Sequence, residues 1–414
     1  MRRRLSTVLR ERDYRRLLGA SVLYGFGREM TFVAVGWQVY AIDRNPFHLG
    51  LVGLAEFLPL LLFALPAGAI SDRFSRKHVY LASLLVDAAI TVGLLLVSLS
   101  GAEALWPFLA LSFASGSSAA LGNPAIRSMW PSLVPLPLLT QALALRSTVF
   151  QATVVTGPAV GGLLFALDPE AVYGTAAALM LLAALVTAPI ATRAIERAPA
   201  AIVGSRLGSL LAGLRFVRRT PVLLGAISLD LVAVLFGGAV ALLPLFARDV
   251  LEVGPVGLGV LRSAPAVGAL LAGIVLTRRP LGGRAGRKLL VVVGLFGLSI
   301  IVFGLSTSFP LSFAALAVSG FVDMISMQIR AMIVALATPD ELRGRVNAVE
   351  MVFISASNEL GAFESGAAAA LVGAVPAVVG GGCLTIAAAL LWPRLFPRMA
   401  RIDRLESLHP AGGT

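Results

Sequence analysis

The chain has 414 residues, of which 57% are hydrophobic and 14% are charged, with a net charge of +12. Ordinary soluble domains contain about 25% charged residues. A soluble protein of this length with so few charges would expose wide apolar patches to water. The composition therefore predicts an integral membrane protein whose outer surface faces lipid.

Residues with catalytic or metal-binding chemistry are sparse. The single cysteine, Cys383, excludes a disulfide framework and a cysteine-based zinc site, and His48, His78 and His409 lie too far apart for a histidine metal pair. Residues 282–289 depart from the phosphate-binding loop motif at its last positions, and no serine nucleophile elbow occurs. We expect no enzyme activity, no catalytic residue, no metal and no cofactor.

Long apolar runs divide the chain into candidate membrane spans, because a spanning helix needs roughly 20 mostly apolar residues. Charges and Pro/Gly clusters separate twelve such runs. The predicted spans are Leu17–Ile42, Leu49–Ile70, Val79–Leu99, Leu105–Ala125, Ser147–Leu167, Val172–Ala191, Val222–Ala247, Val256–Thr277, Leu289–Leu305, Leu311–Ala337, Asn347–Val372 and Ala377–Leu391.

The basic residues orient these spans. With the N-terminus inside, 29 of the 34 arginines and lysines fall in cytoplasmic segments, including Arg146 in segment 126–146. The opposite side holds only Arg44 and Arg248. Such asymmetry predicts a multi-pass protein of a bacterial inner membrane with both termini in the cytoplasm. It also accounts for the positive charge without nucleic acid, so the lipid bilayer is the expected partner.

The long basic segment in the middle of the chain predicts an amphipathic helix, which would lie on the inner leaflet or dock a partner. Its apolar positions, with arginines between them, are Leu207, Leu210, Leu211, Leu214 and Val217. The predicted parts of the chain are an N-terminal six-helix bundle (1–192), this cytoplasmic linker (193–221), a C-terminal six-helix bundle (222–396) and a cytoplasmic tail (397–414).

The two predicted bundles share sequence features. The segment that begins at Pro135 resembles the one that begins at Pro339, and the offset of 204 residues between them also superposes Gly157 on Gly361. This similarity indicates duplicated six-helix halves. In transporters of that build, the substrate site lies between the halves near the bilayer midplane.

Residues 68–77, GAISDRFSRK, resemble the signature that major facilitator transporters carry between their second and third helices, except that Ser75 stands where the family often has Gly. Residues 36–73 and 209–221 further resemble the enterobactin-exporter and macrolide-efflux branch. The resemblance covers essentially the whole chain. It implies an all-α integral membrane protein with twelve transmembrane helices in two pseudo-symmetric six-helix bundles.

The same signature implies a conformational latch. A carboxylate is favourable beside a helix N-terminus, and a contact made in one state and broken in the other gives a two-state switch. A solvated basic turn would explain the basic residues of the loop but not its aspartate. The residues implied are Gly68, Asp72, Arg73, Arg76 and Lys77.

The fifth predicted span contains a second family-like motif, Gly157, Pro158, Gly161 and Gly162. It resembles the glycine-proline motif of exporters and antiporters in this superfamily, although Thr153 replaces its first glycine. Ordinary close packing of small residues is the alternative interpretation.

Ionisable side chains at membrane depth need an explanation, since each costs about 2.5–3.5 kcal/mol at the bilayer centre. In the resembled family, the first helix of each group of three lines the central cavity, and the second helix of each group lies beside it. This implies six proton-coupling or cavity candidates, whereas Asp87 in the peripheral third helix is expected to be a structural partner. The candidates are Glu29, Glu56, Asp230, Asp323, Arg330 and Glu359.

Two interpretations of these residues stay open. A carboxylate at membrane depth can alternate between protonated and ionised forms as a cavity opens to either side, which would couple transport to protons. Alternatively, buried ion pairs hold the helices in register. Arg330 would then either bind an anion or pair with Asp323, two helical turns away.

The sequence favours a proton-coupled secondary active exporter of a hydrophobic or amphipathic small molecule, a drug or a siderophore, that works by alternating access. A lysophospholipid flippase or a nutrient importer on the same fold is the alternative. A channel or a non-transporting membrane protein would not need midplane carboxylates. The expected partners are the small-molecule substrate and protons, and one chain of twelve helices suffices as a monomer.

Overall fold

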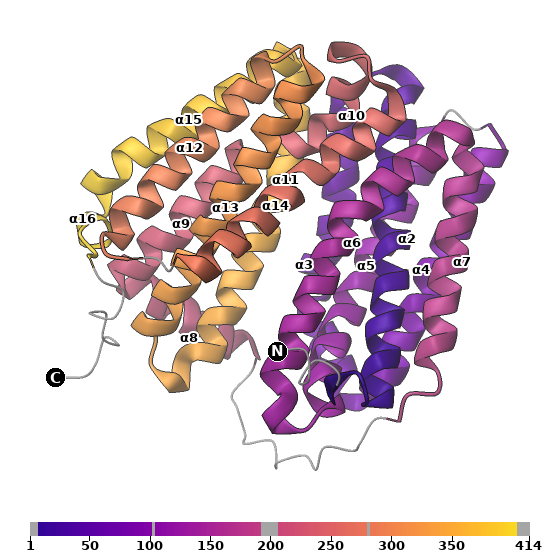
Figure 1. Ribbon diagram of the computed structural model, residues 1–414, viewed down its shortest axis with the longest axis horizontal. Helices are drawn as coiled ribbons and strands as arrows, with labels where there is room; N and C mark the ends of the chain where they lie inside the picture. The colour runs from indigo at the N-terminus through magenta and orange to yellow at the C-terminus, as the bar shows by residue number, and fades with distance from the viewer. Residues whose placement is uncertain (1–6, 102–103, 192–205, 280–281, 404–414) are drawn as a thin grey trace. The chain divides into compact units, whose positions relative to one another are not determined.

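The computed structural model describes residues 7–101, 104–191, 206–279 and 282–403, apart from the side chains of 64–73, 206–207 and 209–210. Every regular element within these ranges is a helix. Each of the twelve predicted spans coincides with one long helix, except the seventh, which is a broken series of shorter helices (Figure 1).

Nine helices of the described part are long and apolar enough to cross a membrane. The other three predicted spans lie in α2 (Arg12–Asp43), α5 (Leu105–Met129) and α14 (Arg343–Val372). These helices are as long as the others but contain more polar residues, and α2 and α14 include the candidates Glu29 and Glu359.

The chain forms two compact units, and the division falls inside α11 (Gly254–Arg278), whose residues up to Ser263 group with unit 1. Unit 1 otherwise consists of α2, α3 (Pro46–Arg73), α4 (Arg76–Leu99), α5, η1 (Trp130–Leu133), η2 (Leu136–Leu138), α6 (Leu139–Leu167) and α7 (Pro169–Thr187).

In unit 1, α2 packs against α6 and α7, α3 against α5, and α4 against α5 and α7. The buried Tyr14 joins three of these elements. Its hydroxyl donates a hydrogen bond to the carbonyl oxygen of Ala142 in α6 at 2.7 Å, and its ring meets that of Trp130 edge to face, with centroids 5.6 Å apart.

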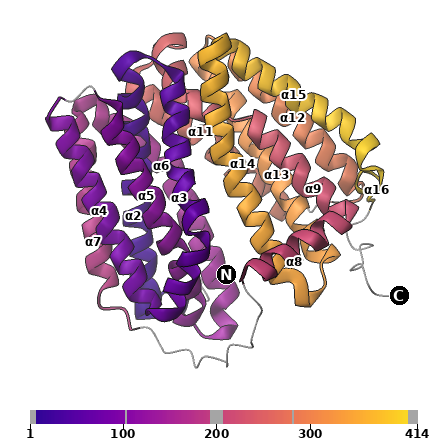
Figure 2. The same cartoon turned by 180° about the vertical axis from the view of Figure 1, so that it is seen from behind.

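Unit 2 comprises α8 (Arg206–Arg219), α9 (Pro221–Phe236), η3 (Ala239–Leu242), α10 (Leu243–Leu245), η4 (Phe246–Val250), the remainder of α11, α12 (Ala285–Leu305), α13 (Phe309–Ala337), η5 (Asp340–Leu342), α14, α15 (Ala374–Leu395) and α16 (Pro397–Ala400). Figure 2 shows α8, α9 and α13 to α16 from behind. Here α12 packs against α13 and α15, and α14 packs against α8 and α9.

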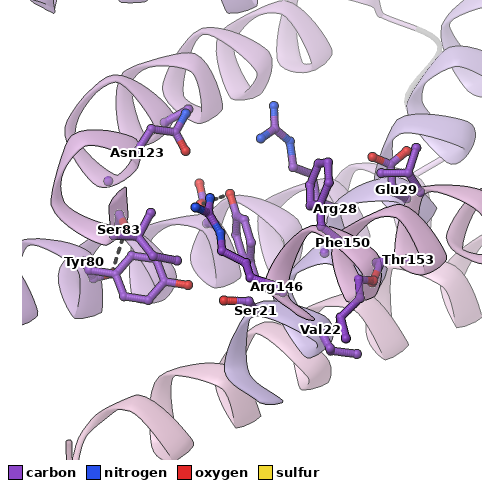
Figure 3. Close-up of a pocket in the computed structure, with 18 of the residues that line it drawn as sticks. Ser21, Val22, Arg28, Glu29, Tyr80, Ser83, Asn123, Arg146, Phe150 and Thr153 are labelled. Carbon is purple, nitrogen blue, oxygen red and sulfur yellow. Dashed lines mark hydrogen bonds between the residues drawn. The ribbon is translucent and has the colours of Figure 1, made fainter. Parts of the chain in front are cut away.

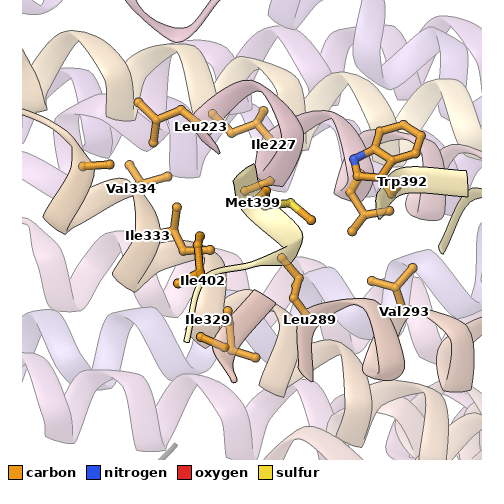
Figure 4. Close-up of a cluster of buried hydrophobic side chains, with 14 of the residues drawn as sticks. Leu223, Ile227, Leu289, Val293, Ile329, Ile333, Val334, Trp392, Met399 and Ile402 are labelled. Carbon is orange, nitrogen blue, oxygen red and sulfur yellow. The ribbon is translucent and has the colours of Figure 1, made fainter. Parts of the chain in front are cut away.

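The core of unit 2 gathers aliphatic side chains from α9, α12 and α13 around Trp392 and Met399 (Figure 4). Trp392 Nε1 donates a hydrogen bond to the carbonyl oxygen of Gly225 at 2.8 Å, which ties α15 to α9. The predicted linker helix is α8, and its Val217 is 1% exposed within this core. Part of the apolar face of α8 therefore packs on its own unit rather than on lipid.

The two units repeat a local structure at the sequence offset noted above. Pro135 precedes η2 and then α6, and Pro339 precedes η5 and then α14. The starts of the two long helices, α6 and α14, are 204 residues apart. Gly157 of α6 lies against α2, whereas Gly361 of α14 lies against α9. Since α2 and α9 contain the first and seventh predicted spans, equivalent helices meet at equivalent glycines.

Candidate functional site

A cavity of about 330 Å³ lies within unit 1, among α2, α4, α5, η1 and α6. Figure 3 shows Tyr80, Ser83 and Asn123 on one side of the view and Arg28 and Glu29 on the other, with Arg146 between them. The polar residues that line the cavity are Ser21, Tyr24, Arg28, Glu29, Tyr80, Ser83, Asp87, Ser118, Asn123, Arg146 and Thr153.

Arg28 is surrounded by acidic groups. Its charge interacts with those of Glu29, Glu56 and Asp87, and its guanidinium carbon lies 5.3 Å from the centroid of the Phe32 ring. Glu56 lines a smaller cavity of about 40 Å³ in unit 1, and Arg28 and Asp87 belong to the walls of both cavities. Two of the predicted candidates, Glu29 and Glu56, therefore share one arginine.

Asp87 is buried in α4 and accepts a hydrogen bond from the Tyr24 hydroxyl at 2.9 Å. The sequence analysis expected a structural partner in a peripheral helix. The structure places this carboxylate in the cavity wall while it also makes a structural hydrogen bond. Asp87 can therefore line the cavity and stabilise the helix packing at the same time. Its position along the chain did not show that it has both roles.

Glu29 has a second arginine within reach. Its Oε2 lies 4.0 Å from Nε of Arg262, which belongs to the part of α11 that groups with unit 1. The guanidinium carbon of Arg262 also lies 5.0 Å from the centroid of the Phe32 ring. Two arginines, Arg28 and Arg262, thus lie near the carboxylates of this part of unit 1.

Unit 2 buries a separate charged cluster. Arg330 of α13 forms an ion pair with Asp230 of α9 at 2.5 Å, and their side chains are 6% and 8% exposed. Asp323 lines a cavity of about 10 Å³ together with Asp230, a volume near that needed for one water molecule. Arg330 also interacts electrostatically with Asp323 and Glu350. The ion pair of Arg330 is formed with Asp230, a partner that the sequence did not indicate beside a bound anion and Asp323.

The remaining candidate, Glu359, lies on α14 and is half-buried. It does not line the cavities described above. The structure thus divides the six predicted residues into Glu29 and Glu56 in unit 1, a cluster of three in unit 2, and Glu359 apart from both. Within the described ranges, no group of three or more His, Cys, Asp or Glu residues could hold a metal ion.

The predicted latch loop is only partly visible. The side chains of Gly68, Asp72 and Arg73, at the end of α3, lie outside the described residues. Arg76 begins α4, and its Nη1 donates to the carbonyl oxygen of Ser128 at 3.5 Å, whereas Lys77 is half-buried. Ser75, the departure from the family pattern, caps α4 by accepting a hydrogen bond from the amide of His78 at 3.3 Å.

The glycine-proline motif of the fifth span lies at helix contacts in α6. A Cβ atom on Gly157 would approach Cβ of Glu29 to 2.8 Å, and one on Gly161 would approach Cα of Met30 to 2.8 Å. Gly162 meets the backbone of Pro255 and Gly259, in the part of α11 that groups with unit 1. These glycines permit close helix approach, as the packing interpretation requires.

Arg146 is the cavity residue that the sequence analysis placed elsewhere. The predicted spans put it in a cytoplasmic segment, but α6 begins at Leu139, so Arg146 lies two turns inside the helix and lines the cavity. Its guanidinium carbon lies 5.1 Å from the ring centroid of Trp130. The available signal was Pro135, because proline often precedes a helix start.

Comparisons with known proteins now identify the family. A family model described as transmembrane secretion effector matches residues 6–410. The chain belongs to this family of major facilitator transporters. Enterobactin exporters of Shigella dysenteriae serotype 1 and of Escherichia coli O139:H28 are each 30% identical to it over 322 residues, which cover 76% of this chain and 75% of the relative.

Solved structures show the same fold at low sequence identity. A bacterial homologue of the human lysosomal transporter Spinster, in an inward-facing and unoccupied conformation, aligns with a TM-score of 0.72 at 14% identity and covers 94% of this chain and 98% of its own. The nucleoside transporter NupG aligns with a TM-score of 0.68 at 13% identity, covering 93% and 99%. The protein is therefore an all-α, multi-pass membrane transporter rather than an enzyme, as the sequence predicted.

Proposed function

We propose that this chain is a proton-driven exporter of a hydrophobic or amphipathic small molecule in a bacterial inner membrane, with both termini in the cytoplasm. The observation that carries the proposal is the clustering of two or three carboxylates around one or two arginines in each unit. In unit 1, Glu29, Glu56 and Asp87 face Arg28 and Arg262. In unit 2, Asp230 and Asp323 face Arg330.

The ionised form of a carboxylate is unfavourable at low dielectric, and a bound proton removes its charge. Water-sized or larger cavities reach these acids in both units, which supplies the hydration that proton exchange needs. A proton could therefore bind when the cavity is accessible from one side of the membrane and leave when it is accessible from the other. The two six-helix halves predicted from the sequence repeat would provide this alternation.

Two further parts of the proposal come from the sequence motifs. Asp72, with Gly68 and the basic residues Arg73, Arg76 and Lys77, would form the latch that is made in one state and broken in the other. The glycines of α6 would let this helix shift against α2 without displacing side chains.

The direction of transport and the substrate class follow the sequence relatives. The matched relatives are named enterobactin exporters, and the cavity of unit 1 combines aromatic and aliphatic walls with charged groups, as suits an amphipathic ligand. A siderophore or a drug of similar character is the substrate that we propose, and a single chain would carry it.

The proposal is tested with the purified protein in proteoliposomes that contain a pH-sensitive dye. Enterobactin and erythromycin are added in turn as probes, and the proton flux that each drives is recorded. We expect one of them to drive proton movement. We also expect that at least one of the single variants Glu29→Gln, Glu56→Gln, Asp323→Asn and Glu359→Gln abolishes proton movement while substrate binding remains.

Glu341→Gln is the matched control, because this glutamate is exposed within η5 and removal of its charge should leave proton flux unchanged. Full coupling in all four variants would overturn proton coupling by these acids. Flux that ignores the pH gradient would instead indicate a channel.

A further inference from the structure

The cavity of unit 1 has a cationic end as well as an acidic one. The ionisable groups that act on Arg146 within the described part of the chain are Arg127, Tyr14 and Tyr80, and none of them is a carboxylate. Arg28, at the other end, interacts with three carboxylates. The positive charge of Arg146 is therefore left without an acidic neighbour while it lines a cavity.

A second donor lies beside it. The indole nitrogen of Trp130 is buried and has no hydrogen-bond partner among the described residues, and Trp130 also lines the cavity. A buried donor without an acceptor is unfavourable, so such groups normally have a hydrogen-bond partner. Arg146 and Trp130 together present two hydrogen-bond donors, one of them charged, and have no acceptor among the residues that the structure describes.

The other side chains that line the cavity determine which kind of hydrogen-bond acceptor can bind there. Apolar side chains line the cavity beside the two donors, and its volume of about 330 Å³ lies within the range of small-molecule sites. An inorganic anion would leave this apolar surface uncovered. The apolar lining residues include Leu18, Phe32, Ile126, Val149, Phe150 and Val154.

We infer that this cavity binds an amphipathic organic anion, whose acidic group pairs with Arg146 and the indole N–H of Trp130 while its apolar body lies against Val149 and Phe150. Glu29, on the Arg28 side of the cavity (Figure 3), repels a second negative charge, so the ligand is oriented with its acidic group towards Arg146. The inference rests on the proposed function, since it names the substrate class of the same transporter.

The test measures binding without any gradient, by isothermal titration of the full-length protein in lipid nanodiscs. The probes are naphthalene-2-sulfonate and a naphthylmethyl-trimethylammonium ion, which share a ring system and differ in charge. We expect the anion to occupy one saturable site and the cation to bind far more weakly.

Variants identify the residues. Arg146→Gln should weaken anion binding about tenfold or more, because a charge-assisted hydrogen bond is lost. Trp130→Phe keeps a ring but removes the N–H, and it should weaken binding about fivefold. Arg12→Gln, the same change at an exposed arginine outside the cavity, should leave affinity unchanged.

Arg146→Lys is the control for a folding defect in Arg146→Gln. It keeps the positive charge but loses the planar guanidinium group, and it should bind the anion more tightly than Arg146→Gln does. Equal affinity of wild type and Arg146→Gln, or tighter binding of the cation, overturns the inference. The measurement needs no proton gradient, so the two proposals can fail separately. Anion binding without proton flux would overturn only the proposed proton coupling. Proton-coupled flux without anion binding would overturn only the anion site.

Discussion

Buried charge in this protein is stabilised locally, and Arg330 illustrates how. The side chain is 6% exposed, and its ion pair with Asp230 joins α13 to α9. An ion that leaves water loses several kcal/mol of solvation, which an opposite charge offsets only in good geometry. Removing one member alone therefore strands the other in a low dielectric, whereas removing both does not.

We predict that Arg330→Met lowers the free energy of unfolding by about 3–5 kcal/mol. The double variant Asp230→Leu/Arg330→Met should recover much of this loss, because apolar side chains can fill the same volume without charge. Equilibrium unfolding in mixed micelles measures both values.

Arg343 and Asp340 provide the matched surface pair. They form an ion pair at 2.8 Å, but their side chains are 52% and 80% exposed. Arg343→Met should cost less than about 1 kcal/mol, since water and salt screen an exposed pair. A loss as large as that of Arg330→Met would show that burial is not what gives the inner pair its effect.

Charged residues at membrane depth could be found from the sequence, but their partners could not. Hydropathy locates Glu29, Asp230 and Arg330 because each interrupts an apolar run. Pairing depends on which helices face each other, and single-sequence hydropathy carries no such information, so Asp230 was not matched with Arg330. Arg146 was missed because the start of its helix, rather than its own residue type, decides its depth.

Helices in this fold approach most closely where a glycine meets the backbone of a neighbour. A Cβ atom on Gly116 of α5 would lie 2.8 Å from the carbonyl carbon of Glu56 in α3, and backbone atoms cannot turn aside as a side chain can. Gly174 of α7 has no neighbouring atom within 4 Å of such a Cβ.

The two glycines should respond oppositely to the same substitution. Gly116→Ala should lower the free energy of unfolding by about 1–3 kcal/mol, because α3 and α5 must separate. Gly174→Ala should raise it by up to about 1 kcal/mol, since alanine favours helix where space is open. Equilibrium unfolding in micelles of both variants tests this, and destabilisation of both would contradict it.

Element positions were largely predictable, because a membrane span demands a long apolar run. The interruption of the seventh span was not. Its hydropathy stays high from Pro221 to Val250, yet α9 ends at Phe236 and shorter helices follow. Hydropathy reports burial in lipid and is insensitive to backbone geometry, although the consecutive Gly237 and Gly238 were a usable signal.

At the scale of the whole molecule, the duplication visible in the sequence reappears in the helix starts of α6 and α14 and in their glycine contacts. An offset of 204 residues aligns Gly237 with Val33, which lies inside the continuous helix α2. Equivalent spans of a duplicated protein therefore differ: one is unbroken and the other is interrupted.

Hydrogen–deuterium exchange of the protein in micelles should reveal this difference. We expect the amides of residues 237–242 to exchange faster than those of 33–38, because short non-α turns hold their hydrogen bonds less well than a continuous α-helix. Peptide-resolved mass spectrometry compares the two segments, and equal protection would refute the expectation.

Such a contrast would have a mechanical consequence. A continuous helix transmits a displacement along its whole length, whereas an interrupted helix bends at the interruption. Evolution of the second copy would then have introduced a flexible joint next to a buried ion pair. The first copy kept a continuous, rigid helix beside the larger cavity.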